Sequence, residues 1–202
     1  MVAGANLDSA PGSPGINDNA TGVAALLATA TALGSAPTVT NAVRFTFWGS
    51  ESLGAAGKYL AGLDPGQRDD IAVYLDADML GSPNAGYFTF DGDQSGQPNP
   101  EITAVPEGSA GVERTLAGYL NLAGVRPADI PLDRTSDYSA FLAAGIPVGG
   151  LTTGSSQKKS AVQARLWGGK AGVPFDPNFR GPRDDIGNVD RHALSLTGPA
   201  IA

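Results

Sequence analysis

The chain has 202 residues and a formal net charge of −7, with only 13 lysine and arginine residues. This length fits one α/β domain spanning residues 1–202, and the few cations argue against nucleic-acid binding, which needs clustered positive charge. Cysteine is absent, which excludes disulfides and thiolate metal sites, and no apolar stretch approaches the roughly 20 residues of a membrane span.

Strands and helices are predicted to alternate along the chain. In chain order, the predicted elements are a strand at 2–5, a helix at 20–33, strands at 42–48, 71–75, 87–90 and 147–152, helices at 51–63, 110–122 and 138–144, and a last helix from about 191. The long segment 155–185 is predicted to be irregular. Such alternation favours a three-layer α/β/α sandwich with a mostly parallel, mixed central sheet.

Three acidic residues follow predicted strands or lie in the loops after them. They are Asp18, Glu51 and Asp78. Open α/β sheets collect ligands at the carboxyl ends of their strands, so we expect these carboxylates to converge there. Their convergence indicates a metal site.

Several blocks of this sequence resemble a known family in order and spacing. The blocks are 4–9, 12–19, 47–54 and 76–82, followed by 136–138, 145–151, 159–163 and 167–169. They are similar to the metal-binding blocks and later conserved-looking segments of the M28 family, the bacterial dizinc aminopeptidases. The resemblance covers essentially the whole chain and implies a zinc-exopeptidase-like fold.

The resemblance also implies roles for the three carboxylates. In this family, two zinc ions about 3.5–4 Å apart share an aspartate and hold the attacking water between them. Carried across, Asp18 is the bridging ligand, Asp78 a terminal ligand and Glu51 the general base. The family's bridging aspartate precedes a cis peptide bond, so the Asp18–Asn19 bond is expected to be cis.

Three of the implied ligand positions hold unsuitable residues. Asn6 stands where the family has histidine, Ser52 where it has the second glutamate of a pair, and Arg180 where it has another histidine. An amide oxygen is a weaker zinc ligand than imidazole, and a guanidinium stays protonated in proteins. Phe179 stands at the position of a tyrosine that assists catalysis, and the lone histidine, His192, is predicted to be a surface residue of the last helix.

These departures predict that zinc, the cofactor of the family, is absent or weakly bound here. The carboxylates and amides that remain suit calcium or magnesium better than zinc. We also predict that Arg180 forms an ion pair with one or more of the retained carboxylates, Asp18, Glu51 and Asp78.

Three interpretations of function follow. The first is an exopeptidase that keeps Glu51 as base and binds one metal through Asp18, Asp78 and Asn6. The second is a catalytically impaired or dead relative that serves as a binding or structural module, with a peptide or protein amino terminus as a possible partner. The third is a deliberately altered derivative of an active enzyme.

Family sheets begin before the element that corresponds to residues 2–5, so the resemblance implies truncation at the amino terminus. An open sheet edge invites pairing, and we predict that another chain or self-association covers it. Relatives are exported, so the resemblance implies a secreted protein, although residues 1–6 lack the features of a signal peptide.

Overall fold

The computed structural model describes residues 1–34, 39–50 and 54–202, and these contain one six-stranded sheet. Across the sheet the strands are β2 (Arg44–Trp48), β1 (Val2–Asn6), β3 (Tyr74–Ala77), β6 (Val148–Thr152), β4 (Phe88–Phe90) and β5 (Ala128–Ile130). The first four strands are mutually parallel, and β4 pairs antiparallel with β6 and parallel with β5. The predicted mostly parallel, mixed sheet is confirmed.

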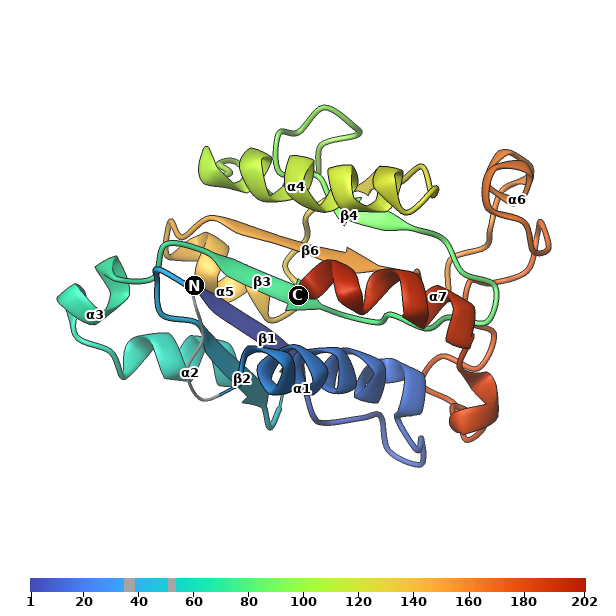
Figure 1. Cartoon of the computed structure of the whole chain (residues 1–202), viewed down its shortest axis with the longest axis horizontal. Coiled ribbons are helices and arrows are strands. Elements are labelled where there is room, and N and C mark those ends of the chain that lie inside the picture. Colours follow the sequence, from blue (N-terminus) through green and yellow to red (C-terminus); the bar gives the residue numbers. More distant parts are fainter. Residues whose placement is uncertain (35–38, 51–53) are drawn as a thin grey trace.

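Helices cover both faces of this sheet (Figure 1). One face packs on α1 (Thr21–Leu33), α4 (Gly108–Leu122) and α7 (Arg191–Thr197), and the other on α2 (Ala55–Ala61) and α5 (Tyr138–Ala143). Two separate clusters of buried apolar side chains fill the two interfaces. The predicted three-layer α/β/α sandwich is therefore also confirmed.

The central strands are buried along their whole length. Every residue of β1 and of β6 is buried, as expected for parallel strands covered on both faces. On the α5 side, the rings of Tyr74 and Phe141 stack with centroids 4.0 Å apart. The Trp48 indole nitrogen donates a hydrogen bond of 2.8 Å to the Tyr74 hydroxyl, which satisfies both polar groups inside the core.

Three short elements differ from the prediction. α6 (Ala161–Trp167) lies inside the segment predicted to be irregular, and α3 (Pro65–Asp69) and β5 were not predicted. Both helices begin with a capping box, from Ser160 and Asp64 respectively, in which side chain and backbone exchange hydrogen bonds across the first turn. The sequence contains the residues of both capping boxes, so the two helices could have been predicted, whereas β5 is too short to show a strand pattern.

Two further predictions are modified. The helix predicted at 51–63 begins at Ala55, because Gly54 adopts a left-handed conformation with φ of 67°; residues 51–53 lie outside the described part of the chain.

β1 is paired on both sides, so within the described residues the sheet ends at β2 on this side. Pairing of another chain with this edge stays a prediction. Among the described helices, none has the length and apolarity needed to cross a bilayer.

Gly4 in β1 provides a test of this core. A β-carbon built at Gly4 would contact the Tyr74 hydroxyl and lie 2.6 Å from the Trp48 indole nitrogen. We expect Gly4→Ala to lower the free energy of unfolding by about 1–3 kcal/mol, because overpacking forces buried rings to move. Urea denaturation measures this change. Gly118→Ala, in an open position on α4, should leave stability unchanged or raise it by up to about 1 kcal/mol; equal effects of the two variants would contradict the packing.

Candidate functional site

A cavity of about 170 Å³ lies where the parallel strands end. Its lining includes Asp18, Asp78 and Arg180, so the structure brings three of the predicted site residues together. Glu51 and Ser52 lie outside the described residues. A larger cavity, about 490 Å³, lies beside α5 and contains none of the predicted site residues.

Asp18 belongs to the turn Ile16–Ala20, which leads from the β1 side of the site into α1. The Asp18–Asn19 peptide bond is cis, as predicted, and the Asp78–Met79 bond directly after β3 is cis as well. The Asp18 residue is 8% exposed, and its carboxylate faces the cavity lined by Arg180. The turn and the end of β3 thus present two carboxylates to one cavity.

Two fully buried carboxylates hold this turn in place. The carboxylate of Asp184 accepts hydrogen bonds from the backbone N–H groups of Asn17 and Asp18, at 2.9 and 3.1 Å. The Asn17 side chain donates to Asp176 at 2.7 Å, and the Asn188 amide donates to both Asp176 and Asp184. No sequence pattern predicts this network, because its members are far apart in the chain and carry no motif.

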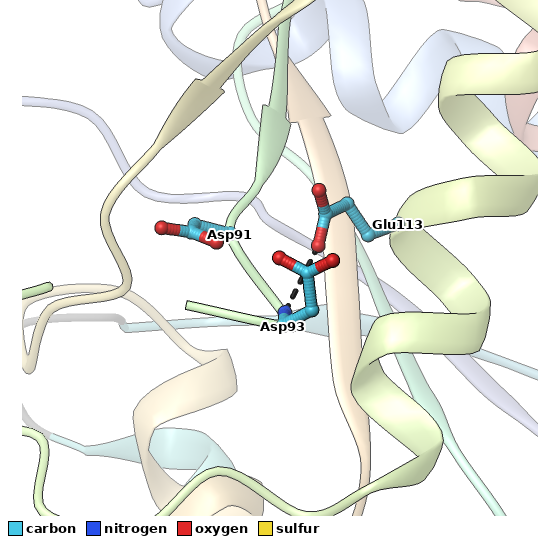
Figure 2. Close-up of side chains that lie close together, drawn as sticks. All are labelled: Asp91, Asp93 and Glu113. Carbon is cyan, nitrogen blue, oxygen red and sulfur yellow. Dashed lines mark hydrogen bonds between the residues drawn. The ribbon is translucent and has the colours of Figure 1, made fainter. Parts of the chain in front are cut away.

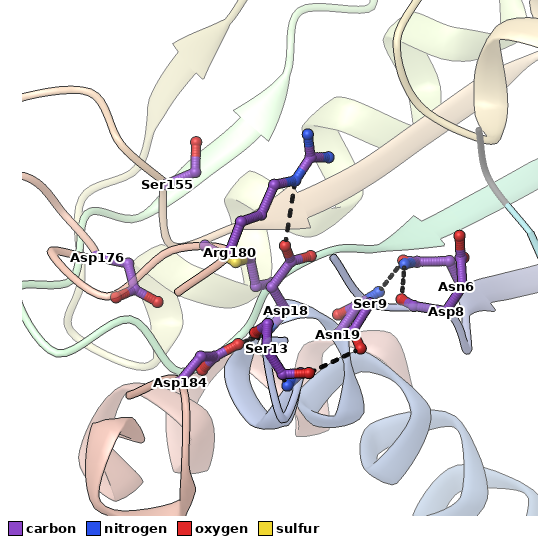
Figure 3. Close-up of polar contacts among 12 residues, drawn as sticks. Asn6, Asp8, Ser9, Ser13, Asp18, Asn19, Ser155, Asp176, Arg180 and Asp184 are labelled. Carbon is purple, nitrogen blue, oxygen red and sulfur yellow. Dashed lines mark hydrogen bonds and ion pairs between the residues drawn. The ribbon is translucent and has the colours of Figure 1, made fainter. Parts of the chain in front are cut away.

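Arg180 contacts the predicted bridging ligand (Figure 3). Its Nε atom lies 3.6 Å from Oδ2 of Asp18, which confirms the predicted ion pair. The guanidinium lies 4.9 Å from the ring centroid of Phe179, and 57% of the Arg180 side chain is exposed. Arg180 has φ of 56°, a backbone conformation that non-glycine residues rarely adopt.

The charge state of Asp18 reflects its surroundings. Burial raises the pKa of Asp18 from its ordinary 3.8 to about 6. The Arg180 cation opposes this increase, whereas the charges of Asp184 and Asp176 add to it. Arg180 therefore keeps a carboxylate ionised that its burial would otherwise tend to protonate.

Asn6, the substituted histidine position, is engaged elsewhere. Its amide oxygen accepts a hydrogen bond of 2.8 Å from the Asn19 side chain, and its amide nitrogen donates to the backbone oxygen of Asp8 at 3.0 Å. Asn6 is 5% exposed and is not part of the cavity lining. Its side chain thus fixes the position of Asn19.

These donors do not fit a zinc ion. Zinc sites in proteins draw on imidazole, thiolate and carboxylate ligands, whereas the described residues at this cavity offer carboxylates beside a permanent cation. The sole histidine, His192, is an exposed residue of α7, as predicted. The amide oxygen of Asn6, a weak zinc ligand in any case, accepts a hydrogen bond from Asn19.

A second acidic cluster lies away from this cavity (Figure 2). In the described part of the chain, Asp91, Asp93 and Glu113 present ligand atoms within 4.8 Å of one another. Glu113 accepts hydrogen bonds from the backbone N–H groups of Gly92 and Asp93, and Asp91 accepts from Ser95 and Gly96. These contacts order the loop after β4 and attach it to α4.

The fold and site define an aminopeptidase-like α/β domain, and comparison of the sequence identifies its family. The model of peptidase family M28 matches residues 1–202, so the chain belongs to this family. It is 53% identical to a probable lipoprotein aminopeptidase, LpqL, of Mycobacterium tuberculosis, and 40% identical to an aminopeptidase of Pseudomonas aeruginosa. The alignments cover 100% of this chain but only 41% and 37% of those relatives.

Solved structures show the same fold. A zinc aminopeptidase from Bacillus subtilis, BSAP, superposes with a TM-score of 0.75 at 21% identity, covering 99% of this chain and 44% of that one. Glutaminyl cyclase from Porphyromonas gingivalis superposes with a TM-score of 0.70 at 17% identity, covering 100% of this chain and 69% of that one. At such identities the likeness establishes the architecture and leaves the chemistry to the site.

The ion pair predicts that the pKa of Asp18 changes when Arg180 is replaced. Replacing Arg180 by Gln removes a cation that lowers the pKa of Asp18, so this pKa should rise above about 6. Because the folded pKa exceeds the ordinary value, Asp18 contributes fully to stability below about pH 3.8 and this contribution is lost as the pH rises through about 6. In the variant, that loss should extend to higher pH.

Carboxyl ¹³C shifts followed against pH measure the pKa, and urea denaturation at several pH values measures the stability. Arg183→Gln is the matched control, because Arg183 is exposed and outside the cavity lining. The same Asp18 pKa in both variants would show that the ion pair has no electrostatic effect.

Glu113 should matter for stability rather than ligand binding. Glu113→Ala leaves the N–H groups of Gly92 and Asp93 without their acceptor, and we expect a loss of about 1–3 kcal/mol in unfolding free energy. Glu113→Gln retains an acceptor oxygen and should lose less. Urea denaturation compares the two variants, and an alanine variant as stable as the parent would mean that water replaces the carboxylate.

Proposed function

We propose that this M28 domain is a non-catalytic relative that binds the amino terminus of peptides without zinc. The observation that carries the proposal is the position of Arg180, whose guanidinium lies 3.6 Å from the carboxylate of Asp18. In the family resemblance, Asp18 is the ligand shared by two metal ions. A permanent cation beside that carboxylate repels a dication and takes over its role as counter-charge.

The charges of the cavity favour a cationic ligand group. Its described lining contains the carboxylates of Asp18, Asp78 and Asp133 against the single guanidinium of Arg180. An α-ammonium group is attracted to such a surplus of carboxylates, because Coulomb attraction is strong in a partly desolvated site. A peptide amino terminus carries this group, whereas an internal peptide segment does not.

The cavity also has an apolar wall. Phe90, Ile130 and Tyr138 are also among its lining residues. Small-molecule sites typically combine apolar walls with a few placed polar groups. These apolar residues are therefore suited to the apolar side chain of the first residue of a bound peptide, while the α-ammonium group of that peptide contacts the aspartates.

The same residues argue against turnover. A metal ion polarises the scissile carbonyl, but a guanidinium has no vacant coordination position and supplies hydrogen bonds only. Phe179, which lines the cavity, has no hydroxyl group with which to stabilise a developing oxyanion. A domain of this kind retains recognition and lacks the groups for hydrolysis.

The alternative is an active metallo-aminopeptidase with an atypical site and Glu51 as general base. The names of the relatives favour it, since proteins 53% and 40% identical to this chain are described as aminopeptidases. One of them is named as a probable lipoprotein, which also supports an exported location as part of either proposal.

Zinc content and amino-terminal binding test the proposal together. After dialysis against zinc, we expect less than about 0.1 zinc per chain by elemental analysis and no hydrolysis of leucine 4-nitroanilide. Leucinamide should bind, measured by chemical-shift titration, whereas N-acetyl-leucinamide should not, because it lacks the ammonium group. Asp18→Asn should weaken leucinamide binding by about tenfold, because one carboxylate is lost.

Near-stoichiometric zinc together with turnover that Glu51→Gln abolishes would establish the alternative. Equal binding of leucinamide and its acetylated form would contradict amino-terminal recognition whatever the metal content.

A further inference from the structure

We propose that Arg180 makes this cavity a receptor for free α-amino acids, whose carboxylate it binds while the aspartates bind the ammonium group. The inference rests on the proposed amino-terminal recognition and narrows its ligand from peptides in general to the zwitterion. The substitution that removes a metal position thereby supplies an anion-binding group in the same place.

The geometry brings opposite charges to neighbouring points of the cavity. Arg180 approaches Asp18 through Nε, at 3.6 Å, and Figure 3 shows the end of the guanidinium extending beyond this contact. A charge-assisted N–H···O hydrogen bond is usually about 2.7–2.9 Å long, so the ion pair is loose. A guanidinium has five N–H donors in a planar fork that matches a carboxylate.

The position of Arg180 is suited to a ligand contact. Its side chain is 57% exposed, lines the cavity and packs over the ring of Phe179. Its backbone is held at a φ of 56°, and such sparsely populated conformations persist where the surrounding structure enforces them, often at functional sites. The guanidinium charge is therefore accessible from the cavity.

The zwitterion matches this arrangement better than a peptide does. An α-amino acid carries its ammonium and carboxylate groups on the same carbon atom, so the two groups can face neighbouring carboxylate and guanidinium groups at once. The carbonyl of a peptide is neutral and forms weaker hydrogen bonds with a guanidinium than a carboxylate forms. The cavity, about 170 Å³, is also smaller than the roughly 300–1,000 Å³ of sites for drug-sized ligands.

Three ligands with the same carbon skeleton separate the contributions of the two charges. Leucine carries both groups, leucinamide lacks the carboxylate, and 4-methylpentanoate lacks the ammonium group. We expect the dissociation constant of leucine, from isothermal titration or chemical-shift titration of the intact chain, to be at least about tenfold lower than that of either analogue.

Variants assign this preference to Arg180. Arg180→Gln should make leucine bind no tighter than leucinamide, because its carboxylate then faces only the aspartates. Arg180→Lys should keep part of the preference, because an ammonium group retains the charge without the fork. Arg183→Gln, which alters an exposed arginine outside the cavity, should leave all three dissociation constants unchanged. Thermal denaturation shows whether each variant is folded.

Each outcome decides between the two proposals. Equal binding of leucine and leucinamide by the parent chain overturns the inference and leaves amino-terminal recognition standing. A leucine preference that persists in a folded Arg180→Gln variant overturns the role of Arg180. If neither leucine nor leucinamide binds, both proposals fail.

Discussion

The site depends on the two buried carboxylates that connect the turn before α1 with the loop before α7. Asp184 accepts the backbone N–H groups of Asn17 and Asp18, and Asp176 accepts from the Asn17 side chain. Both carboxylates are almost fully buried. If either lost its hydrogen-bond donors, a buried charged group would be left unsatisfied, at the full cost of its desolvation. This requirement holds together two segments that are about 160 residues apart in the chain. Arg180 lies between Asp176 and Asp184 in the sequence, so the same network positions Arg180 beside Asp18.

That placement puts a positive charge beside the buried carboxylate of Asp18. Burial raises the pKa of Asp18, the charges of Asp184 and Asp176 add to this effect, and the Arg180 cation opposes it. A metal ion supplies two positive charges but requires ligands of the right kind, whereas Arg180 supplies one charge and requires only an acceptor. The amide of Asn6 then orders Asn19. The same fold thus supports a site that hydrogen bonds and a single cation hold together.

The chain shares its family and fold with aminopeptidases, and it departs from the resemblance at implied ligand positions. High identity over the whole chain and a TM-score of 0.75 to a zinc aminopeptidase establish family and fold. Of the differing positions that the structure describes, Asn6 ends β1 and Arg180 lies in the loop before α7, at the edge where open α/β sheets collect ligands. Under the proposed function, recognition of an amino group depends on the retained aspartates, and the loss of hydrolysis follows from the positions that have changed.

The sequence by itself determined the fold class and the order of the main strands and helices, because alternation and ordered motifs are local signals. It also predicted the convergence of Asp18 with Asp78 and, through the family resemblance, the ion pair of Arg180. Only the tertiary structure decided the partners of buried polar groups: Asp184 beneath the turn, Asn6 against Asn19, and Glu113 at the loop after β4. It also decided that β1 is an interior strand and that α6 interrupts the long loop. Hydrogen bonds between residues distant in the chain leave no periodic pattern, so they become visible only when folding brings those residues together.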